Sequence, residues 1–176
     1  MEKRGLFIGR FQPFHLGHLE ALKWILSRED RVVIGIGSSQ YSHTHKNPFT
    51  LGERIEMIWR VLKQEGILDK CLFASIPDTD EVHSLWVAQV KSCCPPFSTA
   101  YSNDPLTILL FKEAGIPVMN IPFFKRTIYE GTRIREMIAK GDREWEKLVH
   151  PEVAKFIREI KGEDRLRSIY INKTRK

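Results

Sequence analysis

A ten-residue stretch near the amino terminus limits the fold of this chain more than any other segment. It runs Gly9-Arg10-Phe11-Gln12-Pro13-Phe14-His15-Leu16-Gly17-His18 and follows a short apolar run at residues 6–8. Apolar residues then recur at positions 16, 19, 22, 25 and 26, which is the period of a helix. The order is therefore strand, tight turn and helix, with the strand expected at 4–9 and the helix at 15–28.

The same stretch predicts a phosphate site. His15 and His18 lie three residues apart in the first helical turn, so both imidazoles face the same way. The free N–H groups and the positive dipole end of that helix favour an anion. Arg10 adds a positive charge, and Gly9 allows another group to approach the backbone closely. A partial metal site is the alternative, but no third ligand lies nearby in the sequence.

The rest of the chain alternates strands and helices. Further strands are expected at 31–37, 71–77, 97–102 and 116–121. Further helices are expected at 51–65 and around 153–160. Of three others, one is expected to begin at Ser84, one to end at Ala114 and one to begin at Gly131. This alternation predicts an α/β fold, a single-domain Rossmann-like open parallel sheet flanked by helices. We expect one domain over 1–176, with a catalytic core at about 1–140, a helical part at about 141–170 and a basic tail at 171–176.

Three local signals refine this picture. Thr50 and Glu53 form a capping box ahead of an amphipathic helix, in which Trp59 has the spacing of a core residue. Ser84 is a candidate N-cap for the following helix. Thr132 is a candidate N-cap three residues before Arg135, which leaves backbone N–H groups available for a phosphate.

Two other patterns favour a nucleotide without identifying one. Gly35 and Gly37 imitate the start of a dinucleotide fingerprint, but the third Gly is missing and no helix follows directly, which excludes the dehydrogenase interpretation. The glycines more simply allow a substrate to lie against the end of the strand. In the polar loop at 38–48, Lys46 can reach a phosphate, whereas His43 and His45 are a weak metal signal and a solvated loop is the competing interpretation.

Gly-Arg-Phe-Gln-Pro-Phe-His-x-Gly-His resembles the signature of the nucleotidyltransferase superfamily, which includes the class I aminoacyl-tRNA synthetases. The particular residues of this motif resemble those of the archaeal-type nicotinamide-nucleotide adenylyltransferases. Thr132-x-x-Arg135 resembles the second signature of the superfamily. The resemblance implies transfer of the adenylyl group of ATP to nicotinamide mononucleotide (NMN), giving NAD and pyrophosphate. It also implies Mg²⁺ held mainly by the nucleotide and water, with no protein metal site, and a homo-oligomer, since relatives form hexamers.

The resemblance also assigns residues, and we retain these assignments as expectations. Catalysis is assigned to Arg10, His15, His18 and Arg135. The expected ATP-binding residues are Gly9, Arg10, Phe11, Gln12, Phe14, His15, His18, Lys46, Asn103, Thr132 and Arg135. The expected NMN-binding residues are Gly37, Ser38, Asp80 and Trp86, with Trp86 stacked on the pyridinium ring. The chain departs from the family pattern at Lys46, His83 and Glu130, where Arg, Asn and Ser are common.

Bulk properties leave a few alternatives open. A net charge of +6 suits a polyphosphate-binding enzyme and equally a nucleic-acid binder. Three Cys, no apolar run of about 20 residues and no signal-peptide pattern favour a cytoplasmic protein. The remaining candidates are the same chemistry on nicotinate mononucleotide or phosphopantetheine, and a non-catalytic module that binds NAD or nucleic acid.

Overall fold

The computed structural model describes residues 2–122, 125 and 127–174. Arg126 of the expected last loop, and Arg175 and Lys176 of the expected basic tail, lie outside the described residues. The chain divides into two compact units. The sheet unit comprises Met1–Arg10, Glu20–Gln40 and Ile67–Phe123, and the helical unit comprises Phe11–Leu19, Tyr41–Gly66 and Phe124–Lys176. The expectation of a single domain stays a prediction.

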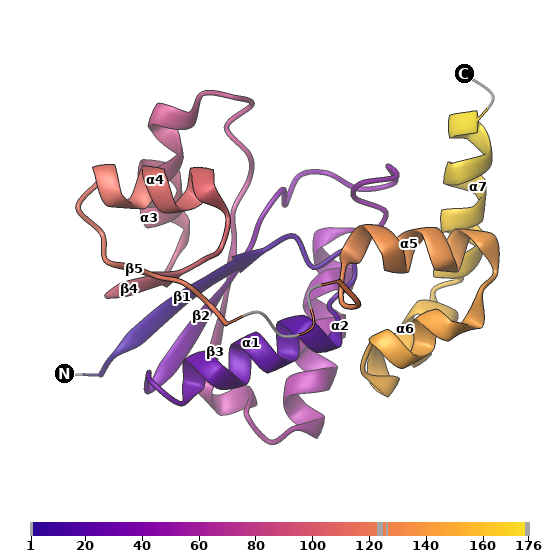
Figure 1. The fold of residues 1–176 in the computed structure, drawn as a ribbon, viewed down its shortest axis with the longest axis horizontal. Helices are drawn as coiled ribbons and strands as arrows, with labels where there is room; N and C mark the ends of the chain where they lie inside the picture. Colours follow the sequence, from indigo (N-terminus) through magenta and orange to yellow (C-terminus); the bar gives the residue numbers. More distant parts are fainter. Residues whose placement is uncertain (1, 123–124, 126, 175–176) are drawn as a thin grey trace. The chain divides into compact units, whose positions relative to one another are not determined.

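The sheet unit contains a five-stranded parallel sheet in the order β3-β2-β1-β4-β5. The strands are β1 (Arg4–Gly9), β2 (Arg31–Ile36), β3 (Cys71–Ser75), β4 (Thr99–Tyr101) and β5 (Val118–Met119). β1 lies in the middle, with β2 on one side and β4 on the other, so the strand order reverses there (Figure 1). In open sheets of this kind, ligands bind beyond the carboxyl ends of the strands at such a reversal. The expected fold class is confirmed.

Helices cover both faces of this sheet. α3 (Trp86–Cys93) and α4 (Pro105–Glu113) lie on one side, and α1 (Leu16–Leu26) lies on the other (Figure 1). The buried core of the first side contains Leu6, Val33, Ala74, Ile76, Val87, Val90, Ala100 and Phe111. These residues come from the strands, α3 and α4, and burial of this apolar surface stabilises the layer by roughly 25 cal/mol per Å².

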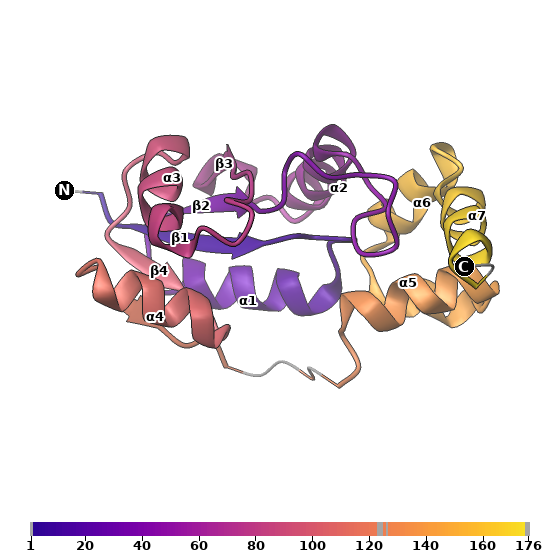
Figure 2. The ribbon, with the colours of Figure 1, turned by 90° about the horizontal axis from the view of Figure 1, so that it is seen from above.

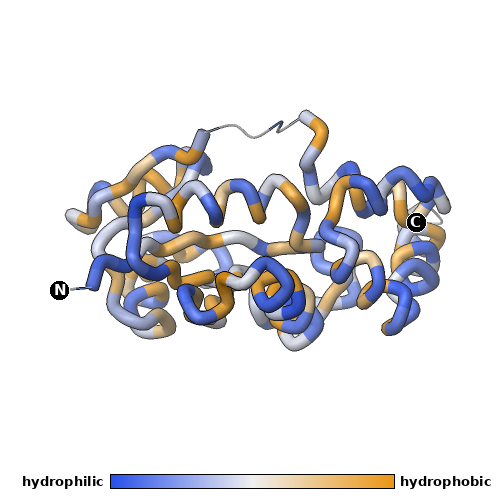
Figure 3. Tube along the Cα trace, turned by 90° about the horizontal axis from the view of Figure 1, so that it is seen from below, coloured by the Kyte–Doolittle hydropathy of each residue, from blue (hydrophilic) through white to orange (hydrophobic). Residues whose placement is uncertain are grey.

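The helical unit consists of α2 (Leu51–Gln64), α5 (Gly131–Lys140), a 3₁₀ segment (Arg143–Leu148), α6 (Pro151–Glu159) and α7 (Gly162–Thr174). α5, α6 and α7 lie close together (Figure 2). Hydrophilic and hydrophobic residues alternate along these helices (Figure 3), and α5 and α6 are clearly amphipathic. The capping box of α2 is confirmed, since Thr50 and Glu53 exchange both hydrogen bonds. None of the helices among the described residues has the length and apolarity that crossing a membrane would require.

Several local predictions are wrong. Ser84 is not an N-cap, because it lies inside the 3₁₀ turn His83–Leu85 that precedes α3. Thr132 is not an N-cap either, because α5 already begins at Gly131. Trp59 is 37% exposed, since it lies on the outer side of α2. α7 was not predicted, because its apolar residues give only a weak helical period.

Candidate active site

His15 and His18 lie against each other at the start of α1. Their rings are stacked, with centroids 3.5 Å apart. The backbone N–H of His15 donates to Nδ1 of His18, and the backbone N–H of His18 donates to Nδ1 of His15, each at 3.2 Å. Because both Nδ1 atoms accept, each neutral ring carries its proton on Nε2. The pair therefore offers two Nε2–H donors.

Both imidazoles are neutral at physiological pH. Burial lowers the pKa of His15 to about 3. Burial also lowers the pKa of His18 well below its ordinary value, and the neighbouring His15 adds to this effect. A neutral Nε2–H still donates a hydrogen bond to an anionic phosphate oxygen. The chemistry expected of the two residues therefore does not require protonated rings.

Aromatic side chains support this pair. Phe11 and Phe14 are both 1% exposed, and their ring centroids lie 4.9 and 5.6 Å from that of His18. Phe11 has a φ of 52°, in the left-handed region that non-Gly residues rarely adopt. Both buried side chains thus pack against His18. Residues held in a left-handed backbone conformation, as Phe11 is, cluster at functional sites.

Gln12 is occupied by protein contacts. Its Nε2 donates to the carbonyl of Phe49 and its Oε1 accepts from the N–H of Phe49, both at 2.9 Å. Gln12 is 3% exposed. The amide therefore pairs with one peptide unit, as a neighbouring strand would, and holds the loop at 41–49 against the first motif.

The second motif meets the first. Nη1 of Arg135 donates to the carbonyl of Gln12 at 2.9 Å, and its Nε donates to the carbonyl of His45 at 3.0 Å. Its Nη2 donates to Oγ1 of Thr132 at 3.2 Å. Arg135 is only 4% exposed. The structure therefore brings together the first motif, the loop at 41–49 and the beginning of α5 around one guanidinium.

The remaining expected phosphate contacts are more exposed. Lys46 projects from the loop at 41–49 and Thr132 lies in the first turn of α5, both on the surface of the helical unit. Gly9 and Arg10 belong to the sheet unit, where Gly9 ends β1 and Arg10 is exposed immediately after it. The structure thus gathers His15, His18, Thr132 and Arg135 in one unit, and places Arg10 at the end of a strand in the other.

The ends of β2 and β3 meet in the sheet unit. Ser38 is buried with a φ of 47°, and its hydroxyl donates to Oδ2 of Asp78 at 2.9 Å. The backbone N–H of Gly37 donates to the carbonyl of Gly9 at 2.9 Å, and a Cβ at Gly37 would lie at an ordinary 3.8 Å from that oxygen. Gly35 differs, because a Cβ there would lie 2.7 Å from Ile76. Packing therefore explains Gly35, whereas a side chain at Gly37 would meet its neighbours only at ordinary van der Waals distances.

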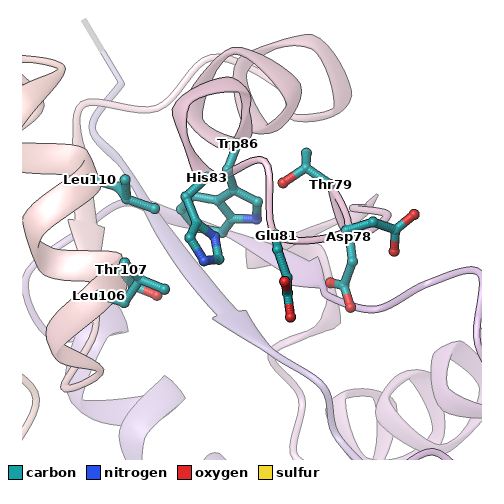
Figure 4. A pocket seen from close by; sticks show the side chains of 9 residues that line it. Asp78, Thr79, Glu81, His83, Trp86, Leu106, Thr107 and Leu110 are labelled. Carbon is teal, nitrogen blue, oxygen red and sulfur yellow. The ribbon is translucent and has the colours of Figure 1, made fainter.

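A cavity of about 430 Å³ opens beside this strand end. Its lining residues are Asp78, Thr79, Asp80, Glu81, His83, Trp86, Leu106, Thr107 and Leu110 (Figure 4). The indole of Trp86 packs edge-on against Phe111, with centroids 5.3 Å apart, so Trp86 belongs both to the core and to the cavity wall. Asp80 and Glu81 have φ values of 45° and 69°. An aromatic face and several carboxylates suit a flat cation.

Asn103 repeats the behaviour of Gln12. Its Nδ2 donates to the carbonyl of Ile121 at 2.7 Å, and its Oδ1 accepts from the N–H of Ile121 at 2.9 Å. The next residue, Asp104, caps α4 by accepting from the N–H of Thr107. Asn103 therefore holds the segment after β5 beside the end of β4.

Four further residues belong to the site or its surroundings: Asp78, Glu81, Thr107 and Tyr129. Asp78 anchors Ser38, and Glu81 and Thr107 line the cavity. The ring of Tyr129 lies 6.4 Å from that of His15, and its Cβ would be 2.8 Å from a Cβ on Gly17. Gly17 is thus required by close packing. Asp78 and Glu81 carry a sequence signal, because acidic residues after a predicted strand indicate either Mg²⁺ ligands or a solvated turn. Thr107 and Tyr129 carry none.

The model of the cytidylyltransferase-like family matches residues 6–137, a span that contains both signature segments. The chain belongs to the cytidylyltransferase-like family. Among relatives in this family, the nicotinamide-nucleotide adenylyltransferase of Caldivirga maquilingensis is 46% identical over 94% of this chain and 93% of that protein. The proteins of the same name from Archaeoglobus fulgidus and Pyrococcus furiosus are 47% and 44% identical, over 94% and 97% of this chain and 97% and 90% of the relatives. The resemblance seen in the sequence is confirmed.

Solved structures support the fold. A bifunctional NMN adenylyltransferase/ADP ribose pyrophosphatase from Francisella tularensis, complexed with AMP and a manganese ion, superposes with a TM-score of 0.74 at 24% identity. The match covers 96% of this chain and 52% of that longer chain. The nicotinic acid mononucleotide adenylyltransferase of Plasmodium falciparum superposes with a TM-score of 0.61 at 14% identity, over 93% of this chain and 98% of that one.

Proposed function

We propose that the protein transfers the adenylyl group of ATP to NMN, giving NAD and pyrophosphate. One observation carries this proposal: the guanidinium of the second motif, Arg135, donates to the carbonyl of Gln12 in the first motif at 2.9 Å. The two motifs therefore form one site. Relatives that are 44–47% identical over nearly the whole chain bear the name of this activity.

The reaction is a direct in-line displacement. A phosphate oxygen of NMN attacks the α-phosphorus of ATP and forms a new P–O bond. The bond from the α-phosphorus to the bridging oxygen breaks, and pyrophosphate leaves with that electron pair. The attacking phosphate is already ionised at neutral pH, so the step needs neither a general base nor a covalent intermediate. Catalysis then consists of positioning and electrostatic stabilisation.

The triphosphate is bound by groups from both motifs. The Nε2–H groups of His15 and His18 donate to phosphate oxygens, with His18 at the α-phosphate, while Arg10 and Arg135 neutralise the leaving pyrophosphate. Lys46 and the first N–H groups of α5, near Thr132, add further contacts. Gly9, Phe11 and Phe14 shape the site. Gln12 and Asn103 serve it through the backbone segments that they hold, Phe49 and Ile121.

Magnesium accompanies the nucleotide in this proposal. Among the described residues, no group of three or more His, Cys, Asp or Glu side chains lies close enough to hold a metal ion. Phosphate oxygens and water are the ligands that Mg²⁺ usually keeps. The ion bound in this way would neutralise charge on the phosphates, while the protein supplies the imidazole and guanidinium donors.

NMN occupies the cavity of the sheet unit in this proposal. Trp86 stacks on the pyridinium ring, and the carboxylate of Asp80 faces the positive charge. Gly37 and Ser38 border the sugar and phosphate. The cavity volume of about 430 Å³ is in the range of small-molecule sites.

Release of pyrophosphate from ATP and Mg²⁺ tests the function, with NMN, nicotinate mononucleotide and phosphopantetheine as separate acceptors. Trp86→Ala should raise the KM of NMN about tenfold, corresponding to the loss of roughly 1.4 kcal/mol of stacking, and leave the KM of ATP unchanged. Trp86→Phe should restore most of the affinity. Trp59→Ala, on the exposed face of α2, is the matched control. Unchanged NMN kinetics in Trp86→Ala would contradict the stacking role. Failure to release pyrophosphate with any of the three acceptors would contradict the function.

The proposal also includes a cytoplasmic location and a homo-oligomeric assembly for the protein. The described cysteines are unpaired thiols, as expected in a reducing cytoplasm. The family resemblance supports a homo-oligomer, with a hexamer as the expected size. Light scattering of the purified chain at several concentrations measures that size directly.

A further inference from the structure

One face of α7 lies along the loop at 41–49. Gly162, Arg165 and Tyr170 all contact this loop, and Leu166 between them is fully buried. Residues spaced in this way share one side of a helix. α7 therefore lines the loop at three successive points.

The first contact is at the beginning of the helix. A Cβ on Gly162 would lie 3.1 Å from Cε1 of Phe49 and 3.0 Å from Cγ2 of Ile157. Phe49 itself is fully buried, and its peptide is the one that Gln12 holds. The start of α7 thus packs directly on the anchored end of the loop.

Arg165 makes the strongest contact. Its Nη1 donates to the carbonyl of Pro48 at 3.1 Å and to Oε2 of Glu53 at 2.6 Å, and its Nη2 donates to Oε1 of Glu53 at 2.7 Å. Such a two-pronged pair is stronger and more directional than a single contact. Since Glu53 is also the partner of Thr50 in the capping box of α2, one guanidinium joins α7, the end of the loop and the start of α2.

The third contact reaches the catalytic guanidinium. The ring of Tyr170 lies edge-on to that of His45, with centroids 6.4 Å apart, and the carbonyl of His45 accepts from Arg135. Burial raises the pKa of Tyr170, and the neighbouring Arg135 opposes that rise. Tyr170 of α7 and Arg135 of α5 therefore both contact the same loop residue, His45.

We propose that Arg165 is a positioning residue for adenylyl transfer: by clamping Pro48 and Glu53 to α7, it fixes the loop that presents Lys46 and receives Arg135. The proposal rests on the proposed function. Arg165 does not touch the reacting atoms, and its effect passes through the backbone of residues 45–49.

Arg165→Ala removes both contacts at once. We expect the KM of ATP to rise roughly tenfold, as for loss of a hydrogen bond from a charged group. The KM of NMN should change less than about twofold, because neither Pro48 nor Glu53, which Arg165 contacts, lines the cavity proposed for NMN. Arg165→Lys keeps the charge without the fork and should recover only part of the affinity. Glu53→Gln preserves the capping box, which accepts Gln, but weakens the clamp.

Arg60→Ala is the matched control. Arg60 also joins α2 to a C-terminal helix, with Nη1 2.9 Å from Oε2 of Glu159 and a side chain 23% exposed, against 20% for Arg165. It should lower thermal stability to a similar degree without changing the KM of ATP. Equal KM values of ATP in Arg165→Ala and Arg60→Ala would overturn the proposal.

Amide hydrogen exchange gives a readout that does not need turnover. The N–H groups of Thr44, Asn47 and Phe49 are hydrogen-bonded within the loop or to Gln12, so they should exchange faster in Arg165→Ala and not in Arg60→Ala. Calorimetric titration with ATP and Mg²⁺ replaces KM if the wild-type protein transfers no adenylyl group. A wild-type protein without transfer activity would refute the proposed function. Unchanged amide exchange together with unchanged ATP affinity in Arg165→Ala would refute the positioning role of Arg165.

Discussion

At the residue scale, the pairing of His15 with His18 determines what the site can do. Each backbone N–H is bound by the other ring, which fixes the proton of both imidazoles on Nε2. A neutral Nε2–H group keeps its proton near pH 7, so it remains able to donate a hydrogen bond to a phosphate. The same two residues would be poor general bases, since their lone pairs on Nδ1 are already used. This agrees with a reaction that moves no proton.

His18→Asn separates the two functions of one ring. The Asn Oδ1 can take the place of Nδ1 and accept from His15, but the Nε2–H donor is lost. We expect kcat to fall by about 10²–10³, as when one oxyanion donor is removed, with little change in melting temperature. Steady-state kinetics and thermal unfolding check this. A variant with wild-type kcat would exclude His18 from the α-phosphate.

The buried imidazoles also predict acid sensitivity. An unfolded His titrates near pH 6.5, whereas burial lowers the pKa of His15 to about 3 and that of His18 well below its ordinary value. Between these limits the unfolded chain binds more protons, so the free energy of unfolding should fall as pH falls from about 6.5 towards 3. Denaturant unfolding across this range measures the slope, and ¹⁵N spectra of the rings should retain the Nε2–H tautomer at pH 5. His18→Asn should have a shallower slope.

At the scale of elements, we propose that the segment from Asp78 to Trp86 selects between pyridine nucleotides. Asp78, Asp80 and Glu81 line the cavity with carboxylates, opposite Thr107 and Leu110 of α4. The consecutive left-handed residues Asp80 and Glu81 turn the chain so that this acidic turn stays beside Trp86. A cationic ring with a neutral amide suits such a wall, while the carboxylate of nicotinate mononucleotide would be repelled.

Removing this charge should weaken the selection. We expect the ratio of kcat/KM for NMN to that for nicotinate mononucleotide to exceed about tenfold in the wild type, and to fall several-fold in Asp80→Asn and in Glu81→Gln. Measuring both acceptors at low and high salt checks the electrostatic origin. Asp69→Asn, outside the cavity, serves as the control. A ratio that stays constant in both variants would assign the selection to shape.

At the scale of the whole molecule, the two units divide the proposed substrates. Of the proposed triphosphate groups, His15, His18 and Arg135 belong to the helical unit and Arg10 to the sheet unit, which also contains the cavity proposed for NMN. Amide exchange with single ligands should therefore give separate footprints. ATP should protect residues 42–49 and the start of α5, and NMN should protect residues 78–86 and the start of α4. Identical footprints for the two ligands would contradict the division.

The sequence determined the strand–turn–helix order, the sheet class and the phosphate motif, because hydrophobic period and His spacing are local properties. It also indicated the capping box of Thr50 and Glu53 and the acidic turn. Tertiary structure alone decided that Gln12 and Asn103 bind backbone, that Trp59 lies outside, and that Arg165 reaches a loop more than a hundred positions away. Such contacts depend on packing between distant segments, and no local period encodes which amide or guanidinium will meet which carbonyl.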